Sequence, residues 1–222
     1  MRLPTIAERA EHVRLLTAAA CRRCGRSPED VTIVAITKGF PPAAIQQAVS
    51  AGFRHLGENR VQEAQAKRPA LADLPGVTWH MVGHLQSNKV KTALELFDII
   101  HSVDSLHLAE AISRRALREA PVFLEVNVGG EVTKHGFTLA ELPQRYESIA
   151  RLPKMDVRGL MTVAPLAPHP DGVRPVFRRL REAAAALGLR ELSMGMSDDF
   201  EAAVEEGATH LRIGRAIFGE RK

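Results

Sequence analysis

The sequence predicts an α/β fold in which eight parallel strands close into a single (β/α)8 barrel. Two observations lead to this prediction: short apolar runs rich in β-branched residues recur along the chain, and stretches of helical period separate them. Strands that alternate with helices form βαβ units and a parallel sheet. Eight such units in 222 residues are typical of a closed barrel. A doubly wound open sheet is the alternative, because a strand count from sequence can err by one or two.

The elements are assigned in chain order from these patterns. The expected strands are the apolar runs at 31–37, 53–57, 78–83, 98–103, 122–128, 157–163, 191–195 and 210–214. The expected helices are the amphipathic stretches at 42–51, 60–71, 87–96, 105–119, 139–151, 173–187 and 197–206, preceded by an additional helix at about 5–24. No linker, low-complexity segment or composition break divides the chain, so we expect one domain over residues 1–222.

The composition is that of an ordinary globular protein and argues against a nucleic-acid-binding role. Hydrophobic residues make up 45% of the chain and aromatic residues only 5%, so Ala, Val, Leu and Ile must build the core. The formal net charge is +4, and the basic residues are scattered or sit on helical faces rather than in a stripe. This balance suits an anionic small-molecule ligand without requiring one.

The first helix ends with two cysteines, Cys21 and Cys24, in a C-x-x-C spacing just before Gly25. A zinc site would need a second pair of ligands, so we interpret these cysteines as small residues that pack a helix end. The N-terminus has no apolar signal core, and no apolar run approaches the length of a membrane span. We therefore expect a cytoplasmic protein with no membrane partner.

The first strand delivers a lysine to a loop. The run 31–37 stops at Lys38 and is broken by Gly39 and Pro41. An amine held at the mouth of an apolar scaffold can form a Schiff base with a carbonyl compound, although most lysines at strand ends are simply solvated. The position of Lys38 at the C-terminal end of a barrel strand favours a functional role, because barrels of this type have their active-site residues at that end.

The other strands end mainly in polar residues and glycines, with one methionine among them. Those residues include Asn59, Asn127, Ser193, Met194, Arg212, Gly214 and Arg215. After the seventh strand, Gly195 allows a ligand close to the backbone, and Ser197 is expected at the N-cap position of the next helix, where a hydroxyl can bind phosphate. The loops after strands seven and eight are the usual phosphate site of this barrel. A lysine beside a phosphate site indicates a phosphorylated aldehyde, with pyridoxal 5'-phosphate (PLP) as the leading candidate.

A histidine pair and a glycine-rich loop have ordinary structural explanations. His80 and His84 lie four residues apart on an expected strand, which separates them by about 13 Å, so they do not predict a metal site. The glycine-rich stretch at 128–136 contains a lysine and a histidine; we expect an ordinary flexible loop, with a mobile lid or a second anion contact as alternatives.

Seven motifs, taken together, resemble the family of PLP-binding homeostasis proteins, also described as proline synthetase co-transcribed homologues. They are AITKG at 35–39, GENRVQE at 57–63, WHMVGHLQSNK at 79–89, KHG at 134–136, GLMT at 159–162, LSMGMS at 192–197, and RIG at 212–214 followed by AIFG at 216–219. The resemblance covers essentially the whole chain. It implies the barrel of the alanine racemase N-terminal domain (PLP fold type III), with PLP held as an aldimine of Lys38.

The resemblance also assigns roles to the other site residues. It implies that Ser197 and the backbone at Gly214 and Arg215 hold the phosphate, and that Arg212 faces the pyridine nitrogen. Asn59, Ser193 and Met194 would line the ring. The sequence departs from the family at Arg215, where Ser or Thr is common, and in the loop Asn127-Val-Gly-Gly-Glu131, where a small hydroxyl residue is usual. These departures affect the phosphate contacts and leave Lys38 in place.

The family's role is to carry PLP in vitamin B6 homeostasis and to affect amino-acid metabolism, without an established turnover. A permanently charged Arg212 cannot accept a proton and weakens the ring as an electron sink. The chain ends soon after the eighth strand, so we also expect no second domain with an opposing acid–base residue. We therefore expect a non-catalytic, monomeric carrier that passes PLP to apo-enzymes. The alternatives are a low-activity PLP-dependent amino-acid racemase and, less favoured, a class I aldolase that uses Lys38 on a sugar phosphate.

Overall fold

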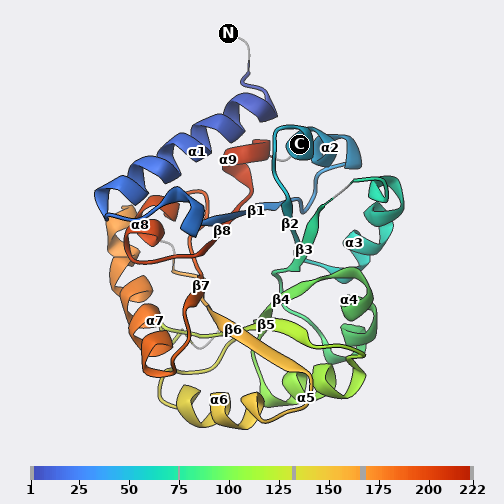
Figure 1. Ribbon diagram of the computed structural model, residues 1–222, viewed down its shortest axis with the longest axis vertical. Helices are drawn as coiled ribbons and strands as arrows, with labels where there is room; N and C mark the ends of the chain where they lie inside the picture. Colours follow the sequence, from blue (N-terminus) through green and yellow to red (C-terminus); the bar gives the residue numbers. More distant parts are fainter. Residues whose placement is uncertain (1–2, 75, 132–133, 166–168, 221–222) are drawn as a thin grey trace.

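Eight parallel strands close into a barrel in the computed structural model, which describes residues 3–74, 76–131, 134–165 and 169–220. The strands follow the chain order around the barrel, and β1 pairs with β8 through Val34 opposite Arg212. Figure 1 shows the ring that they form. The strands are β1 (Thr32–Ile36), β2 (His55–Glu58), β3 (Thr78–Met81), β4 (Ile99–Val103), β5 (Ala120–Glu125), β6 (Met155–Met161), β7 (Glu191–Ser193) and β8 (His210–Ile213). The predicted barrel is confirmed, because β1 and β8 would not pair with each other in an open sheet.

Helices surround this barrel on the outside (Figure 1). They are α1 (Ile6–Arg23), α2 (Pro42–Ser50), α3 (Val61–Lys67), α4 (Val90–Leu96), α5 (Leu106–Arg115), α6 (Leu142–Ala150), α7 (Arg174–Ala186), α8 (Phe200–Glu205) and α9 (Arg215–Phe218). Four short 3-10 turns accompany them, η1 (Pro28–Asp30), η2 (Arg68–Leu71), η3 (Ser87–Lys89) and η4 (Pro170–Val173). None of the helices in the described ranges contains an apolar stretch long enough to cross a bilayer.

The additional N-terminal helix α1 covers the outside of the closure between β8 and β1. It begins with a capping box in which Thr5 and Glu8 satisfy each other's backbone N–H groups. It packs against α2, α8 and α9. Cys21 is fully buried in the apolar cluster, and the Cys24 thiol lies 3.3 Å from the carbonyl oxygen of Ala20. Both cysteines are free, and the burial of Cys21 agrees with the interpretation of these residues as packing a helix end.

Some helices and strands end at other residues than predicted, because a proline or a change of hydrogen-bond partner ends them. The stretch at 60–71 divides because Pro69 cannot donate a backbone hydrogen bond; α3 ends at Lys67 and η2 follows. The strand expected at 122–128 begins at Ala120 and ends at Glu125. Val126 still donates to the carbonyl oxygen of Met161 in β6, and the chain leaves the sheet at Asn127, whose N–H donates to the carbonyl oxygen of Phe137.

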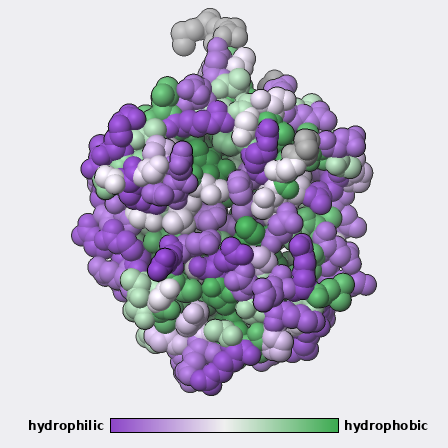
Figure 2. All heavy atoms as spheres, viewed as in Figure 1, coloured by the Kyte–Doolittle hydropathy of each residue, from purple (hydrophilic) through white to green (hydrophobic). Residues whose placement is uncertain are grey.

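The core has two parts. The larger one packs the outer faces of the strands against the helices and includes Phe177, Ile45 and Leu56. Inside the barrel, a smaller set of buried apolar side chains lies apart from that cluster: Val34, Ile36, Phe123 and Met161. Buried polar side chains share this interior, among them His80, His101, Ser193 and Arg212. Polar and charged side chains cover much of the end of the barrel seen in Figure 2, with apolar patches between them. The assignment of one domain to residues 1–222 stays a prediction.

Close packing between β6 and β7 leads to a stability prediction. Gly159 lies opposite Glu191, and a Cβ at Gly159 would overlap the Glu191 carbonyl oxygen. We expect Gly159→Ala to lower the free energy of unfolding by about 1–3 kcal/mol, because two paired strands would have to separate locally. Urea denaturation measures this difference. Gly129→Ala is the matched control, since its Cβ would meet only the Glu131 side chain, at 3.3 Å. Equal effects of the two substitutions would contradict the packing argument.

Candidate functional site

The exits of β1 and β8 lie side by side because these two strands pair. Ala35 is opposite Ile213 in the register, and a Cβ on Gly214 would lie 3.5 Å from the carbonyl oxygen of Ile36. Lys38 follows two residues after the end of β1 and is half-buried. The closed barrel therefore places the predicted lysine next to the turn that begins at Gly214.

A buried network centred on Lys67 of α3 holds the backbone on both sides of Lys38. The Lys67 Nζ donates to the Thr37 carbonyl oxygen at 2.8 Å and to Oε1 of Glu63 at 2.6 Å. Glu63 in turn accepts a hydrogen bond from the backbone N–H of Gly39 at 2.5 Å. Residues 37 and 39 are thus fixed from α3, which restricts the direction in which Lys38 leaves the strand.

Glu58, the last residue of β2, completes this network. Its Oε1 accepts hydrogen bonds from Lys67 Nζ at 2.7 Å and from the Thr37 hydroxyl at 2.6 Å. Burial raises the pKa of Glu58, and the bonds to Lys67 and Thr37 partly oppose that rise. The sequence reasoning missed this network. The i,i+4 spacing of Glu63 and Lys67 on one helix was its only local signal.

Arg212 is a buried cation held by oxygen atoms of the barrel wall. Its Nη1 donates to the carbonyl oxygen and to the hydroxyl of Ser193, at 2.6 and 2.7 Å, and its Nη2 donates to the Thr162 carbonyl oxygen at 2.7 Å. Burial lowers the pKa of Arg212 to about 10, and the nearby carboxyl groups of Glu125 and Asp199 oppose that shift. The guanidinium is therefore charged at neutral pH, as the interpretation of its role requires.

The turns after β7 and β8 meet through Ser197. Its hydroxyl accepts a hydrogen bond from the backbone N–H of Ala216 at 3.2 Å. The expectation that Ser197 caps the following helix was wrong: α8 starts at Phe200, with Asp199 at the N-cap position. The reason is that Asp199 accepts a hydrogen bond from the backbone N–H of Met196 and tightens the turn before the helix.

Arg215, where the sequence departs from the family that it resembles, faces away toward carboxylates. Its guanidinium forms an ion pair with Asp198, and its Nε lies 3.6 Å from Oε1 of Glu220. The Arg215 side chain is exposed. An anion at this turn would therefore meet the backbone N–H groups before it meets the Arg215 side chain.

The other predicted site residues are placed less directly. Asn59 follows β2 and lines a cavity of about 570 Å³ together with Gly83, His84 and Lys89. Met194 is fully buried and belongs to the apolar cluster. The contacts of the described residues bring together Ser193 with Arg212 and Ser197 with Ala216, whereas no such contact joins Asn59 or Met194 to them. Residues 132–133 of the glycine-rich loop lie outside the described residues.

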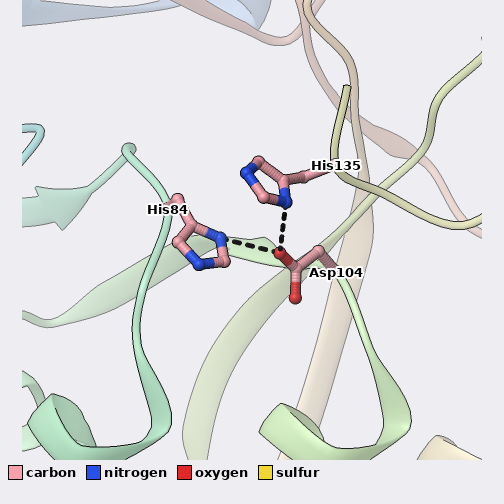
Figure 3. Close-up of side chains that lie close together, drawn as sticks. All are labelled: His84, Asp104 and His135. Atoms are coloured by element: carbon pink, nitrogen blue, oxygen red, sulfur yellow. Dashed lines mark hydrogen bonds and ion pairs between the residues drawn. The ribbon is translucent and has the colours of Figure 1, made fainter. Parts of the chain in front are cut away.

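Three further polar side chains meet at the mouth of the barrel, as Figure 3 shows. His84 and His135 come from the loops after β3 and β5, and Asp104 follows β4. The His84 Nδ1 lies 2.8 Å from Oδ2 of Asp104, and the His135 Nδ1 lies 3.8 Å from the same oxygen. Their potential ligand atoms all lie within 4.8 Å of one another.

The orientation of the two imidazole rings favours a hydrogen-bonded cluster over a metal site. The rings of His84 and His135 are stacked, with centroids 4.1 Å apart and planes only 16° from parallel. A metal ion lies near the plane of each imidazole that binds it, because the lone pair lies in that plane. Two nearly parallel, stacked planes cannot both contain one nearby ion.

Glu125, at the end of β5, is a partly buried carboxyl near Asp104 and Arg212. Burial is the main cause that raises its pKa to about 7, and the charge of Asp104 adds to the shift, whereas Arg212 opposes it. Near neutral pH this group therefore exchanges a proton within the site region. The sequence reasoning did not include Glu125 among the candidates, because its burial depends on how β5 sits in the closed barrel.

Comparison with known proteins gives a consistent result along the whole chain. Residues 19–222 match the alanine racemase N-terminal domain family. The pyridoxal phosphate homeostasis protein of Aquifex aeolicus is 44% identical over 224 residues, which cover 97% of this chain and 98% of that protein.

Solved structures agree with this result. PipY from Synechococcus elongatus PCC7942, solved with PLP bound, is 41% identical with a TM-score of 0.85, and the similarity covers 97% of this chain and 100% of that one. PipY solved without PLP has a TM-score of 0.87. The alanine racemase of Corynebacterium glutamicum shares the fold at 17% identity and a TM-score of 0.71, and the match covers 95% of this chain and 62% of that chain.

The raised pKa of Glu125 predicts a pH dependence of stability. Between about pH 5 and 7 the folded protein keeps a proton that the unfolded chain has already lost, so the free energy of unfolding falls as the pH rises through this range. The loss, up to about 3 kcal/mol, is complete about one pH unit above the folded-state pKa. We expect Glu125→Gln to reduce this decline, as measured by denaturant unfolding at a series of pH values. An unchanged pH profile in the variant would contradict the assignment.

Proposed function

The chain belongs to the family of pyridoxal phosphate homeostasis proteins, which share the barrel of the alanine racemase N-terminal domain, and we propose that it binds PLP at the C-terminal end of its barrel. It carries the cofactor for PLP homeostasis and thereby affects amino-acid metabolism. PLP supplies a reactive aldehyde and an electron-withdrawing ring when it is bound.

The residues at the site fit the three parts of this cofactor. Lys38 provides an amine that condenses with the aldehyde, with loss of one water molecule. Ser197 and the backbone N–H groups at Gly214 and Arg215 provide donors for the phosphate, where the turns after β7 and β8 meet. The ring would lie between these ends, lined by Asn59 and Ser193, with Met194 behind them in the apolar cluster.

Arg212 is the residue that decides between carrying the cofactor and catalysing reactions with it. A guanidinium has five N–H groups and no acceptor. Its hydrogen bonds to Ser193 and Thr162 account for three of those groups, so it has further N–H groups to offer a ring nitrogen. A charged donor at that nitrogen keeps it unprotonated, and an unprotonated ring withdraws electrons from an amino-acid α-carbon less strongly. The site therefore favours carrying the cofactor over catalysing reactions with it.

The names of the relatives support the same interpretation, since they describe homeostasis proteins. A low-activity amino-acid racemase is the second candidate function, because racemases share this fold and Lys38 could also serve as an acid–base group there. The cytoplasmic location, the monomeric state and the transfer of PLP to apo-enzymes stay predictions.

Loss of the anchoring amine gives the first test. We expect the purified protein with PLP to show the visible absorption band of a lysine-bound cofactor, and Lys38→Ala to lose it, because Lys38 supplies the amine of that bond in the proposed arrangement. Lys134→Ala is the matched control: this lysine also follows a strand exit, with its Nζ 3.4 Å from the Val163 carbonyl oxygen, and the band should persist. A wild-type protein without the band, or a Lys38→Ala protein that keeps it, would contradict the proposal.

Hydrogen exchange at amino acids separates a carrier from an enzyme. We expect the PLP-loaded protein to cause no sustained exchange of the α-hydrogen when single L-amino acids are incubated with it in D2O, because Arg212 weakens the electron sink. Proton NMR follows the α-hydrogen signal over time. An authentic alanine racemase with L-alanine, run in parallel, establishes that turnover would be detected. Continuous exchange with any amino acid would support the racemase alternative instead.

A further inference from the structure

Three histidines in the barrel interior form a continuous line of hydrogen bonds. They come from neighbouring strands, β2, β3 and β4, which lie side by side in Figure 1. The His55 Nδ1 lies 3.0 Å from the His80 Nε2, and the His80 Nδ1 lies 2.8 Å from the His101 Nε2. We refer to His55, His80 and His101 as the histidine chain.

The histidine chain ends at the arginine of the cofactor site. The His101 Nδ1 lies 2.8 Å from the hydroxyl oxygen of Ser193, on the opposite side of the barrel. That hydroxyl also accepts a hydrogen bond from Nη1 of Arg212. At its other end, His55 is half-buried and lines a cavity of about 470 Å³ beside the first residues of β1. The chain thus connects the N-terminal mouth of the barrel with the cofactor-facing residues.

The interior keeps these imidazoles uncharged. His80 and His101 are fully buried, and burial lowers the pKa of all three histidines, with mutual repulsion adding to the effect at His80 and His101. His210 packs against both His80 and His101, and burial lowers its pKa to about 4. Other charged groups act on this interior: Arg212 and Arg158 act on His210, Glu125 and Asp199 act on Arg212, and Oε2 of Glu191 lies 3.9 Å from the His210 Nε2. A neutral imidazole carries one hydrogen, on one of its two nitrogens.

Arg212 determines the direction of every bond in the chain. Because a guanidinium only donates, the Ser193 oxygen is the acceptor toward Arg212, and the hydroxyl hydrogen needs another acceptor. Among the described residues, the His101 Nδ1 is the atom in position to accept it. The single hydrogen of His101 then lies on Nε2 and is donated to His80, and by the same reasoning His80 donates from Nε2 to His55.

We propose that the histidine chain is a directed hydrogen-bond relay that positions Arg212 for the cofactor ring through Ser193. His101 and His80 are positioning residues, since neither needs to touch the cofactor. They keep the Ser193 hydroxyl pointed away from Arg212, so that its oxygen stays an acceptor and the guanidinium stays in one orientation. The inference about Arg212 and the ring rests on the proposed function, whereas the direction of the chain does not.

Tautomers measured by NMR test the direction in the cofactor-free, full-length protein. Long-range 1H–15N correlation distinguishes an imidazole nitrogen that carries hydrogen from one that does not. We expect His55, His80 and His101 all to carry hydrogen on Nε2 alone. Ser193→Ala removes the donor that directs the chain and should give mixed tautomers in these three residues, whereas Ser193→Thr, which keeps a hydroxyl, should restore the single tautomer.

His210 is the internal control for this measurement. It lies in the same interior, but its Nδ1 pairs with the Thr209 hydroxyl at 3.0 Å and not with the chain, so its tautomer should be the same in wild type and Ser193→Ala. Hydrogen on Nδ1 of any chain histidine in the wild type would overturn the proposal. Tautomers that stay the same in Ser193→Ala would overturn it as well.

Cofactor binding tests the positioning role. We expect His101→Phe to raise the dissociation constant of PLP about tenfold, the effect of one disturbed hydrogen bond, and His210→Phe to change it less than about twofold. Equal effects of the two variants would overturn the role of His101. Absence of PLP binding in the wild type would contradict the proposed function and leave the tautomer result standing, so the two failures are distinguishable.

Discussion

The pairing of β1 with β8 is the constraint on which the rest of the structure depends. It closes the sheet and places the exit of the first strand beside the turns that follow the last two. Lys38 and Ser197 are 159 positions apart in the chain, and no local preference could bring them to one end of the molecule. Helix α1 supports this closure from outside by packing against α8 and α9. The proposed cofactor site is therefore a consequence of closure more than of any single loop.

The barrel interior is unusual because it buries polar groups where layers of branched apolar residues are the rule. Burying the Arg212 cation is costly unless its N–H groups find acceptors. Two backbone carbonyl oxygens and the Ser193 hydroxyl supply them, and none of these acceptors carries a full negative charge. A carboxylate partner would have neutralised the arginine and reduced its effect on a ring nitrogen. Hydrogen bonding without neutralisation keeps the charge available to the ligand.

The two ends of the site are held in different ways. The backbone around Lys38 is fixed from outside the barrel, by Lys67 and Glu63 of α3. Arg212 is fixed from inside, by Ser193 and the histidines behind it. The lysine and the arginine are thus positioned by separate networks, one in the shell between strands and helices and one in the lumen. Such rigid support suits a protein whose task is to hold a reactive aldehyde in one place.

The residues of the sequence alone determined the alternation of strands and helices, the barrel, and Lys38 at a strand exit, because hydrophobic period and the breaks at Gly39 and Pro41 are local properties. The family motifs added the roles proposed for Arg212 and Ser193. The sequence misplaced the start of α8, since the Asp199 bond to the Met196 N–H competes with the cap expected at Ser197. Only the tertiary structure decided which side chains meet inside the barrel. The contact between His101 and Ser193 joins positions 92 residues apart across the lumen, and it exists because closure turns those strands toward a common interior.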